Sequence, residues 1–131
     1  MRRLLAHTAD LSAEIAAPEL AGLYGEAASL LREILVGTSP VSERESRRIA
    51  LAGDSESERL FRFLRELVYL ADSERFLPAA VALGDGFAAV TGERFDPSRH
   101  VVERQVKALT RHQFALEREN DGYRCRMVFD L

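Results

Sequence analysis

An apolar residue recurs at every third or fourth position over a stretch near the start of the chain. The members of this stripe are Leu20, Leu23, Tyr24, Ala27, Leu30, Leu31, Ile34 and Leu35. Their spacing places them on one face of an α-helix, and such a face must be buried against other structure. Pro18 favours a helix start, because its missing N–H costs nothing there, and Gly37 with Pro40 predicts the helix end.

A second apolar stripe follows a helix-start signal. Ser55 and Glu58 have the spacing of a capping box, and acidic residues suit the positive end of the helix dipole. The stripe consists of Leu60, Phe61, Leu64, Leu67, Val68 and Ala71. We therefore expect a second amphipathic helix over residues 55–72.

The rest of the chain predicts strands. Residues 11–16 alternate between apolar and polar positions, the period of a half-buried strand. Further strands are expected at residues 3–7, 47–51, 77–83, 87–91, 101–110, 113–118 and 123–129. Tight turns are expected at Gly84-Asp85-Gly86 and Asn120-Asp121-Gly122. Two helices with these strands predict one α+β domain over residues 1–131, a mixed β-sheet covered by the helix pair.

Composition excludes several classes of protein. A formal charge of −3 and a pI near 5.7 argue against a basic face for the phosphate backbone, so no direct sequence-specific binding of nucleic acid is expected. Cys125 is the only cysteine, which excludes an internal disulfide and a multi-cysteine zinc site and is typical of a reducing cytoplasm. The apolar stretch at the N-terminus is too short for a signal peptide or a membrane span. We expect a cytoplasmic protein without membrane contact.

Lys107 is the only lysine in the chain, beside seventeen arginines. Lysine carries a compact point charge, whereas arginine carries a delocalised planar one. In a regular strand over residues 101–110, the side chains of Lys107 and Leu109 would share one face. Lys107 could hold a nearby loop, or present a cation to an acidic partner or a nucleotide phosphate. The competing interpretation is an exposed strand lysine without a special role.

Carboxylates gather at both ends of the sequence. Asp10 lies between two expected strands, Asp130 is the penultimate residue, and Leu131 adds a terminal carboxylate. If the last strand pairs near the first hairpin, the three groups converge, and they repel one another unless a cation lies among them. Oxygen ligands favour Ca²⁺, Mg²⁺ or Mn²⁺. His7 is a candidate ligand or a support for Asp10. Alternatively, Asp10 only caps a turn and Asp130 is a polar chain end.

A polar loop precedes the lysine segment. Glu93 comes first, and Arg99 and His100 follow six and seven residues later. Glu93 could form an ion pair with Arg99 or with Lys107, and the sequence favours neither. His112, after the lysine segment, is a weaker candidate for a functional role.

Four short motifs in this order resemble the archease family, small protein partners of the RtcB-type RNA ligase. They are His7-Thr8-Ala9-Asp10, Gly92-Glu93 with Arg99-His100, Val106-Lys107-Ala108-Leu109-Thr110, and the terminal Asp130-Leu131. The resemblance implies an α+β fold on an SHS2-like core (strand–helix–strand–strand) with an inserted helical segment, which would contain the second helix. Two positions depart from the family pattern. Gln105 stands where many members have an acidic residue, and Arg111 stands where a tyrosine is usual.

The resemblance also implies a function. The expected protein is a non-enzymatic activator that promotes GTP-dependent guanylylation of the ligase and multiple turnover in tRNA splicing or RNA repair. Asp10, Asp130 and Leu131 would hold a divalent metal ion. Lys107 would activate the ligase, with His7, Glu93, Arg99 and His100 as further partner contacts.

Two alternatives stay open. One is a small metal-dependent hydrolase that uses the same carboxylates. The other is a chaperone or modulator of another RNA-modifying enzyme. No catalytic residues are expected, because the sequence contains no nucleophile elbow and no phosphate-binding glycine loop.

Overall fold

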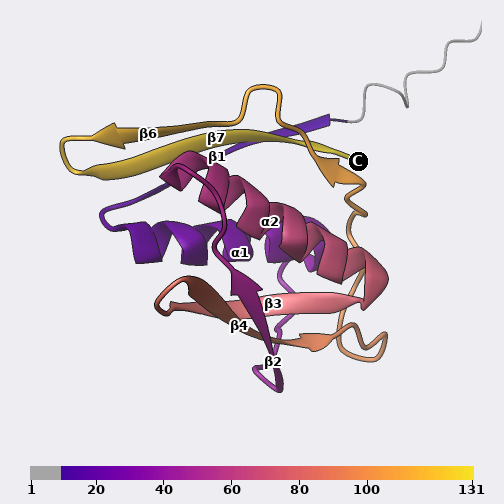
Figure 1. Ribbon diagram of the computed structural model, residues 1–131. Helices are drawn as coiled ribbons and strands as arrows, with labels where there is room; N and C mark the ends of the chain where they lie inside the picture. Colours follow the sequence, from indigo (N-terminus) through magenta and orange to yellow (C-terminus); the bar gives the residue numbers. More distant parts are fainter. Residues whose placement is uncertain (1–9) are drawn as a thin grey trace, which may run out of the picture.

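The computed structural model describes residues 10–131, and its two helices lie between two antiparallel sheets (Figure 1). The helices are α1 (Leu20–Val36) and α2 (Glu56–Ser73). One sheet contains β1 (Asp10–Ala17), β5 (Ala108–Leu109), β6 (Ala115–Glu119) and β7 (Gly122–Asp130), with β7 central. The other has the order β2 (Glu45–Ala50), β4 (Phe87–Arg94), β3 (Phe76–Leu83). Within the described residues, no helix is long and apolar enough to span a membrane.

The α+β class with two helices in one domain is confirmed, but the single mixed sheet is wrong. Each helix buries more of its surface than one sheet covers: Ala28 and Val36 of α1 and Phe63 and Leu70 of α2 are buried beside the predicted stripes. Helix α1 packs against β1 and β3, which belong to different sheets. A helix that is apolar over so much of its circumference needs partners on two sides.

Most local signals are confirmed. The Ser55 hydroxyl oxygen accepts a hydrogen bond from the Glu58 N–H at 3.1 Å and caps α2. Gly37 ends α1 with φ of 60°, in the left-handed region that glycine enters without a steric cost. Both predicted turns connect antiparallel strands, β3 to β4 and β6 to β7. The strand predicted at residues 3–7 lies outside the described residues.

The expected strand at residues 101–110 is mostly wrong. Only Ala108–Leu109 pairs in a sheet. Residues 101–107, called here the crossing segment, pass from the end of β4 to the other sheet (Figure 1). Two backbone hydrogen bonds hold this segment: the Glu103 N–H donates to the Leu35 carbonyl, and the Lys107 N–H to the Asp130 carbonyl, both at 2.8 Å. Because the segment is not a regular strand, Lys107 is exposed while Leu109 is buried, so the two do not share a face.

A close approach of β3 to β4 requires a glycine at position 92. The pairing register shifts between Pro78 and Ala80, and the backbone of Leu77 comes close to Gly92. A Cβ atom at Gly92 would overlap the Leu77 carbonyl oxygen. By contrast, a Cβ at Gly25 in α1 would meet no atom within 4 Å.

These two glycines give a matched pair of substitutions. We expect Gly92→Ala to lower the free energy of unfolding by about 2 kcal/mol, because backbone must move to admit the methyl group. Gly25→Ala should raise it by about 1 kcal/mol, since alanine is the better helix former. Urea unfolding followed by circular dichroism measures both. A Gly92→Ala protein as stable as Gly25→Ala would contradict the close approach.

Candidate functional site

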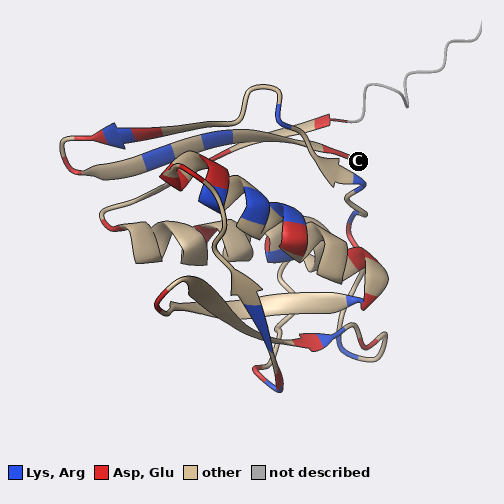
Figure 2. Ribbon diagram, in the orientation of Figure 1, with Lys and Arg blue, Asp and Glu red and all other residues tan. Residues whose placement is uncertain are grey.

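Asp10 and Asp130 lie directly opposite each other at one end of the four-stranded sheet. They are paired residues in the antiparallel register of β1 with β7, and both are exposed. Their inward-facing neighbours Leu11 and Phe129 pack in or against the core, so the two aspartates face solvent from the outer side of the sheet. Figure 2 shows the acidic ends of β1 and β7 at this edge.

Two carboxylates in this arrangement repel each other. Side chains directly opposite on antiparallel strands have Cβ atoms roughly 5 Å apart, and like charges there are destabilising. A divalent cation would relieve this repulsion, and carboxylate oxygens suit hard ions such as Ca²⁺, Mg²⁺ or Mn²⁺. Within residues 10–131, no three His, Cys, Asp or Glu side chains form a group that could hold a metal. The two aspartates therefore supply part of a ligand set, which further oxygen donors would have to complete. His7 lies outside the described residues.

The end of the sheet that carries Asp10 and Asp130 is called here the acidic edge, and the backbone of Lys107 is bonded to it. The hydrogen bond from the Lys107 N–H ends on the carbonyl of Asp130 itself, and Ala108 pairs with Asp130 in the sheet. The side chain of Lys107 is exposed. Among the cations of residues 10–131, only Arg104 and Lys107 form no side-chain hydrogen bond, ion pair or aromatic contact. The segment therefore presents two uncompensated positive charges, and Lys107 carries the one that lies on the residue bonded to Asp130.

Glu93 pairs with Arg99 and not with Lys107. The carboxylate of Glu93 is 3% exposed and accepts two hydrogen bonds from the Arg99 guanidinium and one from the Ser42 N–H at 2.6 Å. A hydrogen bond joins it to Nε2 of His100 at 3.2 Å. These contacts, led by those from Arg99, lower the pKa of Glu93 from 4.5 to about 2. The cluster ties the end of β4 to the loops on either side.

His100 is as buried as Glu93, with a side-chain exposure of 0%. Its Nδ1 accepts a hydrogen bond from the Asp96 N–H at 2.9 Å, so the ring proton lies on Nε2 and is donated to Glu93. The family resemblance implied partner contacts at Glu93 and His100. That role does not fit their burial, because each polar atom already has a partner inside the protein. They hold the turn from which the crossing segment starts. Arg99, 34% exposed, keeps part of its surface open.

The two departures from the family pattern have different surroundings. The Arg111 guanidinium donates to both carboxylate oxygens of Glu58, at 2.6 and 2.9 Å, and stacks 4.2 Å from the centre of the Phe61 ring. Its charge is thus compensated on α2 and adds little to the field at the acidic edge. No sequence signal indicated this pairing, because Arg111 and Glu58 are 53 residues apart. Gln105 is exposed on the crossing segment.

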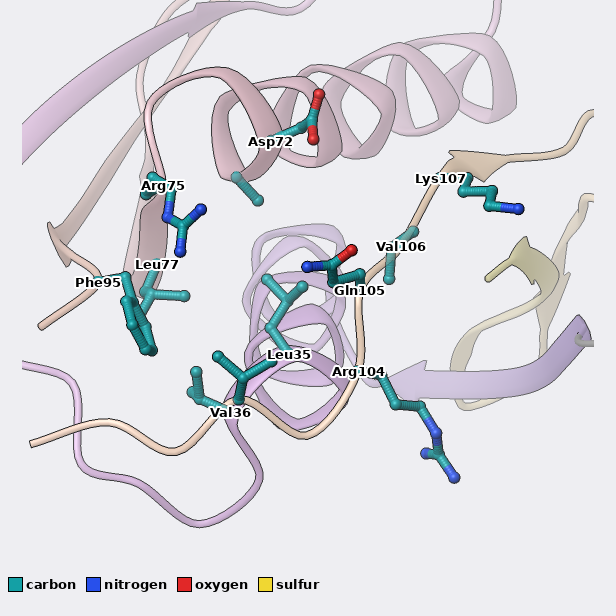
Figure 3. Close-up of a pocket in the computed structure, with 12 residues that line it drawn as sticks. Leu35, Val36, Asp72, Arg75, Leu77, Phe95, Arg104, Gln105, Val106 and Lys107 are labelled. Atoms are coloured by element: carbon teal, nitrogen blue, oxygen red, sulfur yellow. The ribbon is translucent and has the colours of Figure 1, made fainter. Parts of the chain in front are cut away.

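A pocket of about 350 Å³ lies beside the crossing segment, and the sequence did not reveal it (Figure 3). Its apolar walls are formed by Leu35 and Val36 of α1, Leu77 of β3, Phe95 just after β4, and Val106 of the crossing segment. Figure 3 shows Gln105 directed into the pocket and the Lys107 side chain directed away from it.

Cys125 is not available for chemistry. It belongs to β7 and is fully buried on the inner face of the strand, and burial raises the pKa of its thiol to about 12. A free cysteine commonly packs as a small apolar residue, and the surroundings of Cys125 fit that role.

The low pKa of Glu93 predicts a pH dependence of stability. As the pH falls, the unfolded chain takes up a proton at about 4.5, before the folded protein does at about 2. Glu93 therefore contributes stability that is complete above pH 4.5 and is lost as the pH falls toward 2. Glu93→Gln should cost about 2 kcal/mol at neutral pH. The variant lacks the titrating carboxyl, so its free energy of unfolding, measured in urea, should fall less between about pH 6 and about pH 3 than that of the wild type. An equal fall in both proteins would refute the assignment.

Comparison with protein families gives one match over nearly the whole chain. The model of the Archease protein family (MTH1598/TM1083) matches residues 3–131. A protein named archease from Archaeoglobus fulgidus is 32% identical over 136 residues, which cover 98% of each chain. Another, from Sulfurisphaera tokodaii, is 28% identical and covers 95% of this chain and 94% of its own.

Solved structures agree on the fold. The crystal structure of an archease from Thermotoga maritima, described as a possible chaperone, has a TM-score of 0.76 and 24% identity, covering 100% of this chain and 98% of that one. The solution structure of protein 1598 from Methanobacterium thermoautotrophicum has a TM-score of 0.73 and 24% identity, covering 94% and 93%. The α+β fold that the resemblance implied is therefore confirmed.

Proposed function

The chain belongs to the archease family, and from this premise we propose that it is a non-enzymatic activator of an RtcB-type RNA ligase. In this proposal the protein promotes GTP-dependent guanylylation of the ligase and so sustains multiple turnover in tRNA splicing or RNA repair. The observation that carries the proposal is the facing pair of Asp10 and Asp130, with the Lys107 backbone bonded to Asp130.

The acidic edge supports a role at a site that handles phosphates and metal ions. Asp10 and Asp130 face solvent from adjacent strands, and Leu131 follows Asp130 immediately, so a carboxylate at Leu131 would lie beside them. We propose that these three residues hold a divalent ion, with His7 in support. Such an ion, when bound, would neutralise the facing carboxylates and attract phosphate oxygens. The acidic edge would then dock at the nucleotide site of the ligase.

Lys107 supplies the opposite charge beside this edge. Its ammonium group is exposed and has no carboxylate partner among residues 10–131, so it is available to a phosphate or to an acidic residue of the ligase. The cluster of Glu93, Arg99 and His100 lies at the start of the crossing segment, and the hydrogen bond from Lys107 to Asp130 lies at its end. We therefore assign Glu93 and His100 the task of positioning the segment that carries Lys107.

A multiple-turnover ligation assay tests the proposal. RNA with a 2′,3′-cyclic phosphate and RNA with a 5′-hydroxyl are joined by the RtcB-type ligase of the same genome, with GTP and Mn²⁺, with and without this protein. We expect the wild type to give many turnovers per ligase. Asp10→Ala, Asp130→Ala and Lys107→Ala should each reduce the stimulation roughly tenfold or more, because each removes a charge that meets the partner.

Two variants serve as matched controls for that assay. Asp85→Ala removes an exposed carboxylate in the turn between β3 and β4, and Arg118→Ala removes an exposed cation on β6; both should stimulate like the wild type. If the wild type leaves turnover unchanged, the activator proposal fails. Phosphodiesterase activity of the purified protein alone would then favour the hydrolase. Stimulation of another RNA-modifying enzyme would favour a chaperone or modulator, the role suggested in the description of the Thermotoga maritima protein.

A single added residue tests the part assigned to Leu131. In a protein made to end at Leu131, one appended glycine moves the terminal carboxylate by about 3.5 Å and changes no side chain. We expect this extension to reduce both the stimulation and the affinity for Mn²⁺, measured by calorimetry on the protein alone. An extension that matches the wild type in both measurements would remove Leu131 from the metal site and leave the two aspartates.

A further inference from the structure

The pocket beside the crossing segment has an apolar interior and a positively charged rim. Leu77 and Val106 in its walls are buried, whereas Arg75, Arg104 and Lys107 around it are exposed. Asp72 is the only acidic residue that lines the pocket. The lining residues thus carry three positive charges against one negative charge, although the whole chain has a net charge of −3. Figure 3 shows the Arg75 guanidinium at the pocket and the Arg104 and Lys107 side chains directed outward from its rim. This local reversal of sign favours an anionic ligand.

The rim cations lack acidic partners within the protein. Within residues 10–131, Arg104 and Lys107 form no side-chain hydrogen bond, ion pair or aromatic contact. The one such contact of Arg75 is with the ring of Phe95, 5.4 Å from its centre. Eight other arginines of the same part of the chain form ion pairs. They are Arg44, Arg47, Arg62, Arg94, Arg99, Arg111, Arg124 and Arg126. Five further arginines of residues 10–131 have aromatic or carbonyl partners but no carboxylate: Arg32, Arg48, Arg59, Arg65 and Arg118. Arg104 and Lys107 stand apart from these because, in the described part of the chain, their side chains have no hydrogen bond, ion pair or aromatic contact of any kind.

Arg75 is held in a backbone conformation that suits glycine. It follows the last residue of α2 and the cap Glu74, with φ of 58°. A residue with a side chain costs about 1 kcal/mol in this left-handed region, and glycine is the usual choice just after a helix. The chain carries an arginine there instead, and Figure 3 shows its guanidinium beside Phe95 at the pocket. Strain of this kind at a pocket indicates a use for the side chain.

The apolar surface continues beyond the pocket. Val101 and Val102, at the start of the crossing segment, are 64% and 51% exposed, and with Tyr69 they are the only large hydrophobic residues so exposed in the described chain. Val102 also lines the pocket. An apolar strip that extends from a pocket fits an extended polypeptide better than a small molecule, because a chain segment covers both.

We infer that this pocket, with Arg75, Val102 and Arg104 at its rim, binds a short acidic segment of the partner protein, one of whose apolar side chains enters between α1 and the crossing segment. The partner protein here is the RtcB-type ligase, and in this respect the inference rests on the proposed function. Recognition of acidic polypeptide by the pocket does not depend on it. The crossing segment would then contact the partner at both ends, through the pocket at one and the acidic edge at the other.

A defined peptide tests the pocket without the ligase. The probe is the acetylated and amidated peptide Glu-Asp-Leu-Phe-Asp-Glu, titrated into ¹⁵N-labelled protein and followed by NMR. We expect shifts to concentrate at residues 71–77 and 101–107, and affinity to fall as salt is raised. Arg75→Gly, Val102→Glu and Arg104→Glu should each weaken binding roughly tenfold. Arg118→Glu makes the same charge change as Arg104→Glu on β6, away from the pocket, and should bind like the wild type.

The Arg75→Gly variant separates binding from folding. Because glycine relieves the left-handed strain, this variant should unfold at the same urea concentration as the wild type or a higher one. Loss of peptide binding by such a protein cannot come from misfolding. The inference is overturned if the peptide binds elsewhere, if the pocket variants bind it as the wild type does, or if an oligouridine shifts the same residues at lower concentration.

Measurements with the ligase separate this inference from the proposed function. Affinity for the ligase is measured by biolayer interferometry for the same variants, together with the ligation assay. A weaker complex for Arg75→Gly and Val102→Glu, with Arg118→Glu unchanged, supports the pocket as a partner contact. Full stimulation by the pocket variants overturns the inference and leaves the activator proposal standing. Peptide binding without any effect of the wild type on the ligase supports an acidic partner at the pocket but rejects the ligase as that partner.

Discussion

The antiparallel pairing of β1 with β7 is the constraint on which the candidate site depends. It joins the first described strand to the last, and one register decides both faces of the sheet. On the inner face, Ile15 pairs with Cys125, and both are buried against the helices. On the outer face, the same register sets Asp10 opposite Asp130. A shift by one residue would exchange the two faces, so burial of the core and exposure of the acidic pair are specified together.

The crossing segment connects this edge to the rest of the molecule. It has no strand partner of its own over residues 101–107, and it is held by single hydrogen bonds and by the buried Glu93 cluster at its start. This arrangement leaves Arg104 and Lys107 exposed on a fixed backbone while Val106 enters the core region. A buried carboxylate that is fully hydrogen-bonded gives such a segment one position, because every alternative leaves a buried charge unpaired. The pocket and the acidic edge therefore both depend on Glu93 and His100, which are buried and do not themselves contact the partner.

Local features were predictable because they depend on residues a few positions apart. The helix stripes, the Ser55 cap, the end of α1 at Gly37 and the two turns follow from neighbouring side chains and backbone sterics. The two-sheet architecture was not predictable in the same way. It depends on how much of each helix is apolar, and on Phe63 and Leu70, which lie outside the simple stripe of α2. The sequence predicts a strand over residues 101–110, but only Ala108–Leu109 pairs in a sheet. Alternation in a short stretch does not show whether a strand partner exists.

For the candidate site, the sequence by itself determined the residue types: a single lysine, aspartates near both ends, and the ordered motifs that identified the family. Only the tertiary structure decided which of these meet. It paired Asp10 with Asp130, chose Arg99 over Lys107 as the partner of Glu93, directed Arg111 to Glu58, and left Arg75 beside an open pocket. Residue types follow from the chain alone, but these partnerships join residues up to 120 positions apart. Such contacts exist only after the helices and both sheets have packed, because packing brings the distant backbones into register.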